Sequence, residues 1–154
     1  MAGENKIKVR LRLIIIKNNK ILLTQMLEED YYYFTGGKLE FRETLEEGCQ
    51  REIKEECGED TEFKMQKILY VRDFLPEEKP GEHSVEFYIL GTINKFLELD
   101  HQTERDHLEG DRRMEWKDLA NLPDNLYPKE LVPILKKDFK EGFKRQGVYV
   151  GKIK

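Results

Sequence analysis

Glutamate side chains are concentrated in one short segment of the chain, residues 36–58, which holds seven of them. Glu52, Glu55 and Glu56 stand at i, i+3 and i+4, so on a helix they share one face. Like charges at this spacing repel each other by about 0.2–0.5 kcal/mol per pair. Two interpretations are open: a solvated helix surface, or a set of carboxylates that offers hard oxygen ligands to Mg²⁺ or Mn²⁺.

Residues around the glutamates favour the second interpretation. Gly36 and Gly37 allow a tight backbone turn just ahead of the expected helix. Arg51 lies beside the cluster and is able to fix a carboxylate through a forked hydrogen bond. A plain surface helix needs neither feature, so the segment is predicted to form a site.

The spacing of these residues resembles the signature of the Nudix hydrolase superfamily. That signature is Gly, five residues, Glu, seven residues, Arg-Glu, an apolar residue, any residue, Glu-Glu, any residue, Gly. It is filled here by Gly37, Glu43, Arg51, Glu52, Ile53, Glu55, Glu56 and Gly58. The segment Gly37 to Glu59 that carries this signature is the Nudix box. The chain departs from the family at Thr35, Arg42 and Glu59, where members commonly carry Pro, Gly and an apolar residue. None of the three is a presumed metal ligand.

The resemblance implies a metal-dependent hydrolase that cleaves a pyrophosphate bond. Its substrate would be a nucleoside diphosphate linked to another group, such as a nucleoside triphosphate, ADP-ribose, a sugar nucleotide or a dinucleoside polyphosphate. The cofactor would be Mg²⁺ or Mn²⁺. By the same resemblance, the metal ligands would be Glu52, Glu55, Glu56 and the carbonyl of Gly37.

The resemblance also implies roles in catalysis and substrate binding. Arg51 with Glu43 would hold the loop and the helix together. Glu109 lies in the loop before Trp116 and is the candidate general base, with Glu52 as the alternative and a solvated loop residue as the simpler interpretation. Tyr33 and Phe34 lead into the box, where one ring would stack on a nucleobase, unless both belong to the core.

Periodic patterns predict the elements that position these residues. A helix is expected from Thr44 to Cys57, because Thr44 and Glu47 form a capping box and Gly58 suits a left-handed C-terminal cap. A second amphipathic helix is expected near Pro128. Alternating residues predict strands at 6–25 as a hairpin, 31–34, 63–74, 83–93 and 114–119, with a loop over 98–112. With the resemblance, this gives an α+β fold, a Nudix-like α/β/α sandwich with a mixed sheet between helices, in a single domain of residues 1–154.

Composition and charge argue against several other classes of protein. With a net charge of −4, the chain as a whole is not expected to bind polyanions, so no nucleic-acid partner is predicted. Cys49 and Cys57 would lie about 12 Å apart on the predicted helix, too far for a disulfide. The longest apolar run, residues 13–16, is too short to cross a membrane. We therefore expect a cytoplasmic protein with a small nucleotide as partner, and a homodimer is left open.

Other functions compete with the hydrolase. The superfamily includes an isomerase of isopentenyl diphosphate, but Cys49 and Cys57 belong to the apolar stripe of the helix rather than to a pocket. A nucleotide-binding or regulatory relative without turnover, or an acidic helix on an unrelated α+β domain, would not need three aligned carboxylates. The sequence does not specify which nucleoside diphosphate derivative is the substrate.

Overall fold

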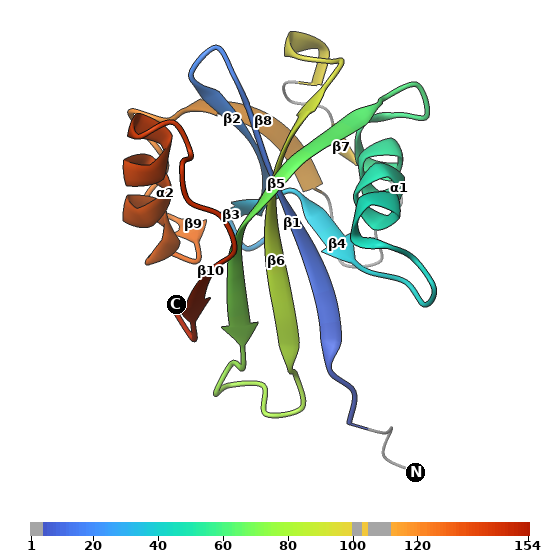
Figure 1. The fold of residues 1–154 in the computed structure, drawn as a ribbon, viewed down its shortest axis with the longest axis vertical. Coiled ribbons are helices and arrows are strands. Elements are labelled where there is room, and N and C mark those ends of the chain that lie inside the picture. Colours follow the sequence, from blue (N-terminus) through green and yellow to red (C-terminus); the bar gives the residue numbers. More distant parts are fainter. Residues whose placement is uncertain (1–4, 100–102, 105–111) are drawn as a thin grey trace.

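The fold was analysed in a computed structural model that describes residues 5–99, 103–104 and 112–154 (Figure 1). Strands are the commonest element of the described residues, with two α-helices and one short 3₁₀ turn. The elements are β1 (Lys8–Lys17), β2 (Lys20–Met26), β3 (Tyr31–Phe34), β4 (Gly36–Lys38), α1 (Leu45–Cys57), β5 (Phe63–Phe74), β6 (Ser84–Ile93), η1 (Leu97–Leu99), β7 (Thr103–Glu104), β8 (Arg112–Asp118), β9 (Leu126–Tyr127), α2 (Leu131–Lys140) and β10 (Val148–Gly151).

The strands form one mixed sheet in the order β10-β5-β6-β1-β2-β3-β9, with β4 paired to β1 and β8 to β2. Strand β1 runs parallel to β6 from Lys8 opposite Ser84 to Ile15 opposite Gly91. Its tip turns back antiparallel to β2, and β5 pairs antiparallel with β6, so both predicted hairpins are confirmed. Because β1 pairs with β6, β2 and β4, it is the strand that joins the two halves of the sheet.

Strand β1 serves two cores because successive side chains of a strand point to opposite faces. Leu11 and Leu13 are buried in the core that α1 covers. Ile14, the next residue after Leu13, is buried in the core that α2 covers. Figure 1 shows α1 and α2 on opposite sides of the sheet, so the predicted sandwich is confirmed.

Helix α1 begins as the sequence predicts. The Thr44 hydroxyl accepts from the Glu47 amide and the Glu47 carboxylate accepts from the Thr44 amide, both at 3.1 Å. The helix ends at Gly58, but with φ 113° and ψ 150°, so the predicted left-handed helical cap is wrong. The conformation still requires a positive φ, which glycine adopts most easily.

Several expected boundaries are different in the structure. Helix α2 starts at Leu131, three residues after Pro128, and Phe143 lies beyond its end with φ 54°. The expected loop over 98–112 contains part of η1 and strand β7, which pairs with β8. Strands β4, β9 and β10 were not predicted, because two to four residues are too few to display an alternating pattern.

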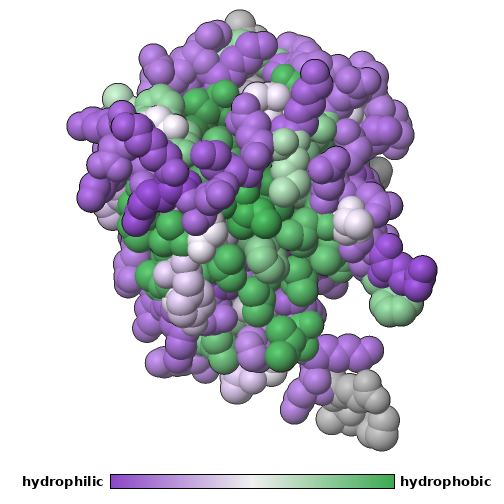
Figure 2. All heavy atoms as spheres, in the orientation of Figure 1, coloured by the Kyte–Doolittle hydropathy of each residue, from purple (hydrophilic) through white to green (hydrophobic). Residues whose placement is uncertain are grey.

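The surface is densely charged, as the composition predicts. Figure 2 shows hydrophilic side chains over most of the visible rim and apolar side chains on the front of the sheet between the two helices. None of the helices in the described ranges has the length and apolar character needed to cross a membrane.

A buried carboxylate ties α2 to the sheet. Asp138 accepts hydrogen bonds from the Tyr70 hydroxyl at 2.7 Å and from Nε and Nη2 of Arg145 at 3.0 Å. Burial alone would raise the pKa of Asp138, but the hydrogen bonds from Arg145 and Tyr70 outweigh it and hold the pKa below its usual value. Asp138 therefore stabilises the folded state in its ionised form.

Asp138→Asn is expected to lower the free energy of unfolding at neutral pH by about 1–3 kcal/mol, because the amide cannot replace a charged acceptor of three hydrogen bonds. Since the folded pKa is lowered, the contribution is complete above a pH of about 4 and disappears as the pH falls through the folded value. Urea unfolding between pH 3 and 7 measures both effects. The exposed Asp118, 3.4 Å from Lys20, gives the control Asp118→Asn. A loss no larger in Asp138→Asn than in this control would contradict the role.

Candidate active site

Two of the predicted carboxylates, Glu52 and Glu56, are buried one helical turn apart on α1. Glu52 is 8% exposed and Glu56 is 4% exposed, whereas the Glu55 side chain is 56% exposed. Burial raises the pKa of Glu52, and the hydrogen bond from Arg51 offsets this only in part. The interpretation as a solvated helix surface is therefore wrong for Glu52 and Glu56. It is correct for Glu55, which lies at the exposed edge of the helix.

Strand β4 lies directly against the Glu52 carboxylate. A methyl group on Gly37 would come within 2.5 Å of Oε1 of Glu52. A methyl group on Gly36 would come within 2.0 Å of the Leu11 carbonyl oxygen, and Gly36 has φ 148°. The two glycines were expected to allow a turn, but they lie in a short strand paired with β1. They are required for close approach instead, Gly36 to the backbone of β1 and Gly37 to the site.

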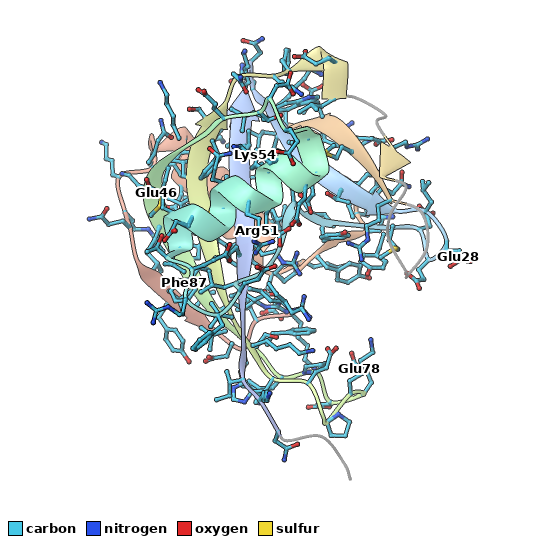
Figure 3. The ribbon with its side chains drawn as sticks, turned by 90° about the vertical axis from the view of Figure 1, so that its right-hand side faces the viewer. Glu28, Glu46, Arg51, Lys54, Glu78 and Phe87 are labelled. Atoms are coloured by element: carbon cyan, nitrogen blue, oxygen red, sulfur yellow. The ribbon has the colours of Figure 1, made fainter. Side chains whose placement is uncertain are left out.

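Arg51 connects the helix to the preceding loop and to β4 (Figure 3). Its Nε and Nη2 donate to the two oxygens of Glu43 at 2.6 and 3.0 Å, which is the expected fork. Nη2 also donates to the Lys38 carbonyl at 2.8 Å, and Nη1 donates to Glu52 at 3.0 Å. The hydrogen bonds from Arg51 hold the pKa of Glu43 below its usual value. One guanidinium thus fixes the loop, β4 and the Glu52 carboxylate relative to one another.

The loop before α1 keeps its shape despite a departure from the family pattern. Arg42 occupies the position where the resemblance expects glycine, and it adopts φ 68°. The next residue, Glu43, still accepts from the Glu40 amide at 2.9 Å while it pairs with Arg51. The substitution therefore leaves the Glu43–Arg51 contact intact.

The aromatic residues before the box have different positions. Phe34 is 1% exposed and packs edge-on against Tyr88 in the α2 core, which favours the core interpretation over stacking on a nucleobase. Tyr33 is partly exposed, and its ring lies 5.3 Å from the guanidinium of Arg12 and 5.9 Å from that of Arg112. Glu109, the candidate general base, lies outside the described residues.

Arg12 is a neighbour of the site that the sequence analysis did not identify. It interacts electrostatically with both Glu52 and Glu56. The alternation of β1 places Arg12 on the face opposite Leu11, but only the pairing of Arg12 with Gly36 brings it to the site. That pairing leaves no signal in the sequence.

The carboxylates suit a divalent cation only as a partial ligand set. Within the described residues, no group of three His, Cys, Asp or Glu side chains has the geometry to hold a metal ion. Glu52 and Glu56 provide two buried oxygen donors, and the close approach of Gly37 adds backbone beside them. Such a set suits Mg²⁺ or Mn²⁺, which retain waters and share ligands with phosphates.

Residues 8–135 match the family model described as the NUDIX domain. The chain belongs to the Nudix family. The match spans both hairpins, the box and the first half of α2, so the resemblance drawn from the box is confirmed across most of the fold.

Solved structures share the Nudix fold at low sequence identity. A Nudix hydrolase from Nitrosomonas europaea has a TM-score of 0.68 and 21% identity, covering 92% of this chain and 93% of its own. A UDP-X diphosphatase has a TM-score of 0.67 and 21% identity over 96% of this chain and 68% of its own. An ADP-ribose pyrophosphatase from Streptococcus suis has a TM-score of 0.61 and 16% identity over 92% and 97%. These likenesses concern the fold.

Proposed function

We propose that this Nudix protein is a metal-dependent pyrophosphohydrolase that acts on a nucleoside diphosphate linked to another group. The observation that carries the proposal is the pair of buried carboxylates, Glu52 and Glu56, held beside the backbone of β4. Burying two like charges is costly, and the hydrogen bond from Arg51 offsets this cost only in part at Glu52. Their arrangement is therefore best explained by a cationic partner that binds between the protein and a phosphate.

Glu52 and Glu56 would hold the cation, Mg²⁺ or Mn²⁺, with the Gly37 carbonyl as a further ligand and Glu55 reaching in from the exposed edge. Bound there, the cation would neutralise charge on the diphosphate and acidify a water molecule. The protein's part is to hold the carboxylates in place, and Arg51 does so through Glu43 and Glu52.

In the proposed reaction, a water oxygen attacks one phosphorus of the diphosphate and the bridging oxygen leaves with the other phosphate. A base must remove the proton from the attacking water. Glu109 remains our candidate for this base, with Glu52 as the alternative. A small nucleotide is the proposed partner, and the domain of residues 1–154 is proposed to act as one unit in the cytoplasm.

The names of similar structures support this substrate class. One is called a UDP-X diphosphatase and another an ADP-ribose pyrophosphatase. Both names describe diphosphates that link a nucleoside to a second group. We extend that shared chemistry to this chain and leave the second group open.

The test is a panel of nucleoside triphosphates, ADP-ribose, sugar nucleotides and dinucleoside polyphosphates, incubated with Mg²⁺ or Mn²⁺ and then with a phosphatase that releases phosphate from the products. We expect release that depends on the metal for at least one compound, and none in EDTA. A protein that binds nucleotides without turnover would bind members of the panel and release nothing. That result would replace the hydrolase with the regulatory alternative.

Arg51→Lys is expected to lower kcat/KM by about 10- to 100-fold, because lysine keeps the charge but cannot make the fork to Glu43. The control is Arg42→Lys, on the same loop, where the side chain is exposed. Kinetics on the best substrate of the panel, with circular dichroism to check the fold, measure the effect. Wild-type kinetics in Arg51→Lys would mean that the fork is not needed.

A further inference from the structure

We infer that Arg12 is a further binding residue of this site, which takes a non-bridging phosphate oxygen of the substrate, and that Glu86 positions it. The inference rests on the proposed function for the identity of the substrate. Its basis in the structure is a chain of buried charges that runs from the glutamate pair across the sheet through Arg12, Glu86 and Arg72.

The location of Arg12 is the first part of the argument. Its Nη1 points to the carbonyl oxygens of Phe34 and Gly36, the residues that lead into Gly37. It interacts electrostatically with Glu52 and Glu56, and its side chain is 15% exposed. A phosphate bound beside the two glutamates would therefore lie close to this guanidinium.

The contacts of Arg12 are long, which is the second part. Its two hydrogen bonds measure 3.4 and 3.5 Å and its ion pair with Glu86 measures 3.6 Å. Arg51 and Arg72, by contrast, make charged contacts of 2.6 and 2.8 Å. A guanidinium has five N–H donors and binds phosphate oxygens well. Arg12 is thus an arginine next to the site with donor capacity left for a ligand.

The positioning of Arg12 is the third part. Glu86 is 3% exposed and accepts from Nη1 of Arg72 and from the Tyr88 hydroxyl, both at 2.8 Å through Oε1. Its other oxygen, Oε2, faces Arg12. Arg72 is in turn held by the Ile153 carbonyl at 2.9 Å. Glu86 is therefore rigidly fixed, and it sets the direction of the Arg12 side chain.

Charge explains why the ligand would be an anion. Glu86 is one carboxylate shared by two arginines, so the group has an excess of one positive charge, which faces the two carboxylates of Glu52 and Glu56. When a divalent cation binds the two glutamates, their charge is neutralised and Arg12 faces uncompensated positive charge. A phosphate group compensates it. Arg12 and the cation would then hold the phosphate from two sides.

The test uses α,β-methylene-ADP as the probe in the presence of Mg²⁺, so that the two glutamates are neutralised and the methylene bridge between the phosphates prevents turnover. We expect Arg12→Gln to raise the Kd for this analogue, measured by NMR titration, by about 10- to 100-fold, since it removes a charged hydrogen bond to phosphate. Arg12→Lys should recover only part of the loss. The control is Arg10→Gln, on the same strand and face, where the side chain donates to Ser84 at 3.3 Å. Equal Kd values in wild type and Arg12→Gln, or an equal loss in Arg10→Gln, would overturn the assignment.

The positioning role is tested by a mutant cycle. Glu86→Gln leaves two buried arginines poorly paired and is expected to impair folding, so Tyr88→Phe, which removes one hydrogen bond to Glu86, is the informative variant. We expect it to raise the Kd for α,β-methylene-ADP about 2- to 5-fold in the wild type and to have no effect in the Arg12→Gln background. Additive effects would show that Glu86 does not act through Arg12.

The inference and the proposed function fail separately. If no compound of the panel is hydrolysed, the proposed hydrolase function is wrong, yet a higher Kd in Arg12→Gln would still establish the phosphate contact. If turnover is found and Arg12→Gln has wild-type KM and Kd, only the inference is lost. Mn²⁺ affinity should be unchanged in Tyr88→Phe, since that residue lies away from the proposed ligands.

Discussion

Glu56→Gln is expected to reduce turnover by about 1,000-fold, because a correctly held metal ion contributes several kcal/mol to transition-state stabilisation. The amide has nearly the same shape as the carboxylate, so the loss would reflect the charge. Calorimetric titration with Mn²⁺ should show a large loss of affinity in the variant. The matched control is Glu46→Gln on the exposed side of the same helix, which should bind metal like the wild type.

The stability of Glu56→Gln distinguishes a ligand from a structural residue. Glu56 is 4% exposed, so replacing its charge removes a desolvation cost as well as repulsion from Glu52. The melting temperature without metal should hold or rise slightly. With Mn²⁺ it should rise in the wild type and stay constant in the variant. Equal Mn²⁺ affinity in the two proteins would remove Glu56 from the site and the main support for the hydrolase.

Alanine at Gly36 is expected to lower stability, whereas alanine at Gly37 is expected to lower activity. At Gly36 a methyl group would collide with the Leu11 carbonyl of β1, at a positive φ that alanine avoids. Backbone cannot move aside cheaply, so the free energy of unfolding should fall by about 3 kcal/mol or more. At Gly37 the atoms nearest to the methyl group would be those of the Glu52 carboxylate, at the end of a flexible side chain. The fold should survive there, with Glu52 displaced and turnover lowered by about 100-fold.

Thermal unfolding and kinetics on both variants measure the contrast. Gly37→Ala should melt close to the wild type but bind Mn²⁺ weakly. Gly36→Ala should melt at a much lower temperature or fail to fold. Full activity in Gly37→Ala would mean that Glu52 does not need its present position, and a stable Gly36→Ala would mean that the β1–β4 contact is not tight.

Local signals in the sequence predicted the elements well. The capping box at Thr44, the apolar stripe of α1 and the alternation in β1 each depend on residues within a few positions of one another. The box predicted the Glu43–Arg51 pair for the same reason, since Glu43 just precedes the helix that contains Arg51. Neighbouring residues contain enough information to predict such features.

Contacts between distant segments could not be predicted from the sequence. The tyrosine and phenylalanine before the box look alike, yet Phe34 is buried by α2-side residues and Tyr33 is not. The role of Gly36 depends on the Leu11 carbonyl, and the role of Arg12 depends on β4. In each case the deciding partner is set by strand pairing, which has no local pattern.

The parallel pairing of β1 with β6 has a consequence for synthesis of the chain. Lys8 pairs with Ser84, so the pairing of β1 with β6 must wait until β6 has been synthesised. At 5–20 residues per second, this takes roughly 4–15 s after β1 is made. During that interval a strand with the run Leu13 to Ile16 is exposed to other nascent chains. Lys8, Arg10 and Arg12 alternate with its apolar residues, and charges in such positions oppose aggregation. In the nascent chain, Arg12 would therefore protect an unpaired strand before it has any substrate to bind.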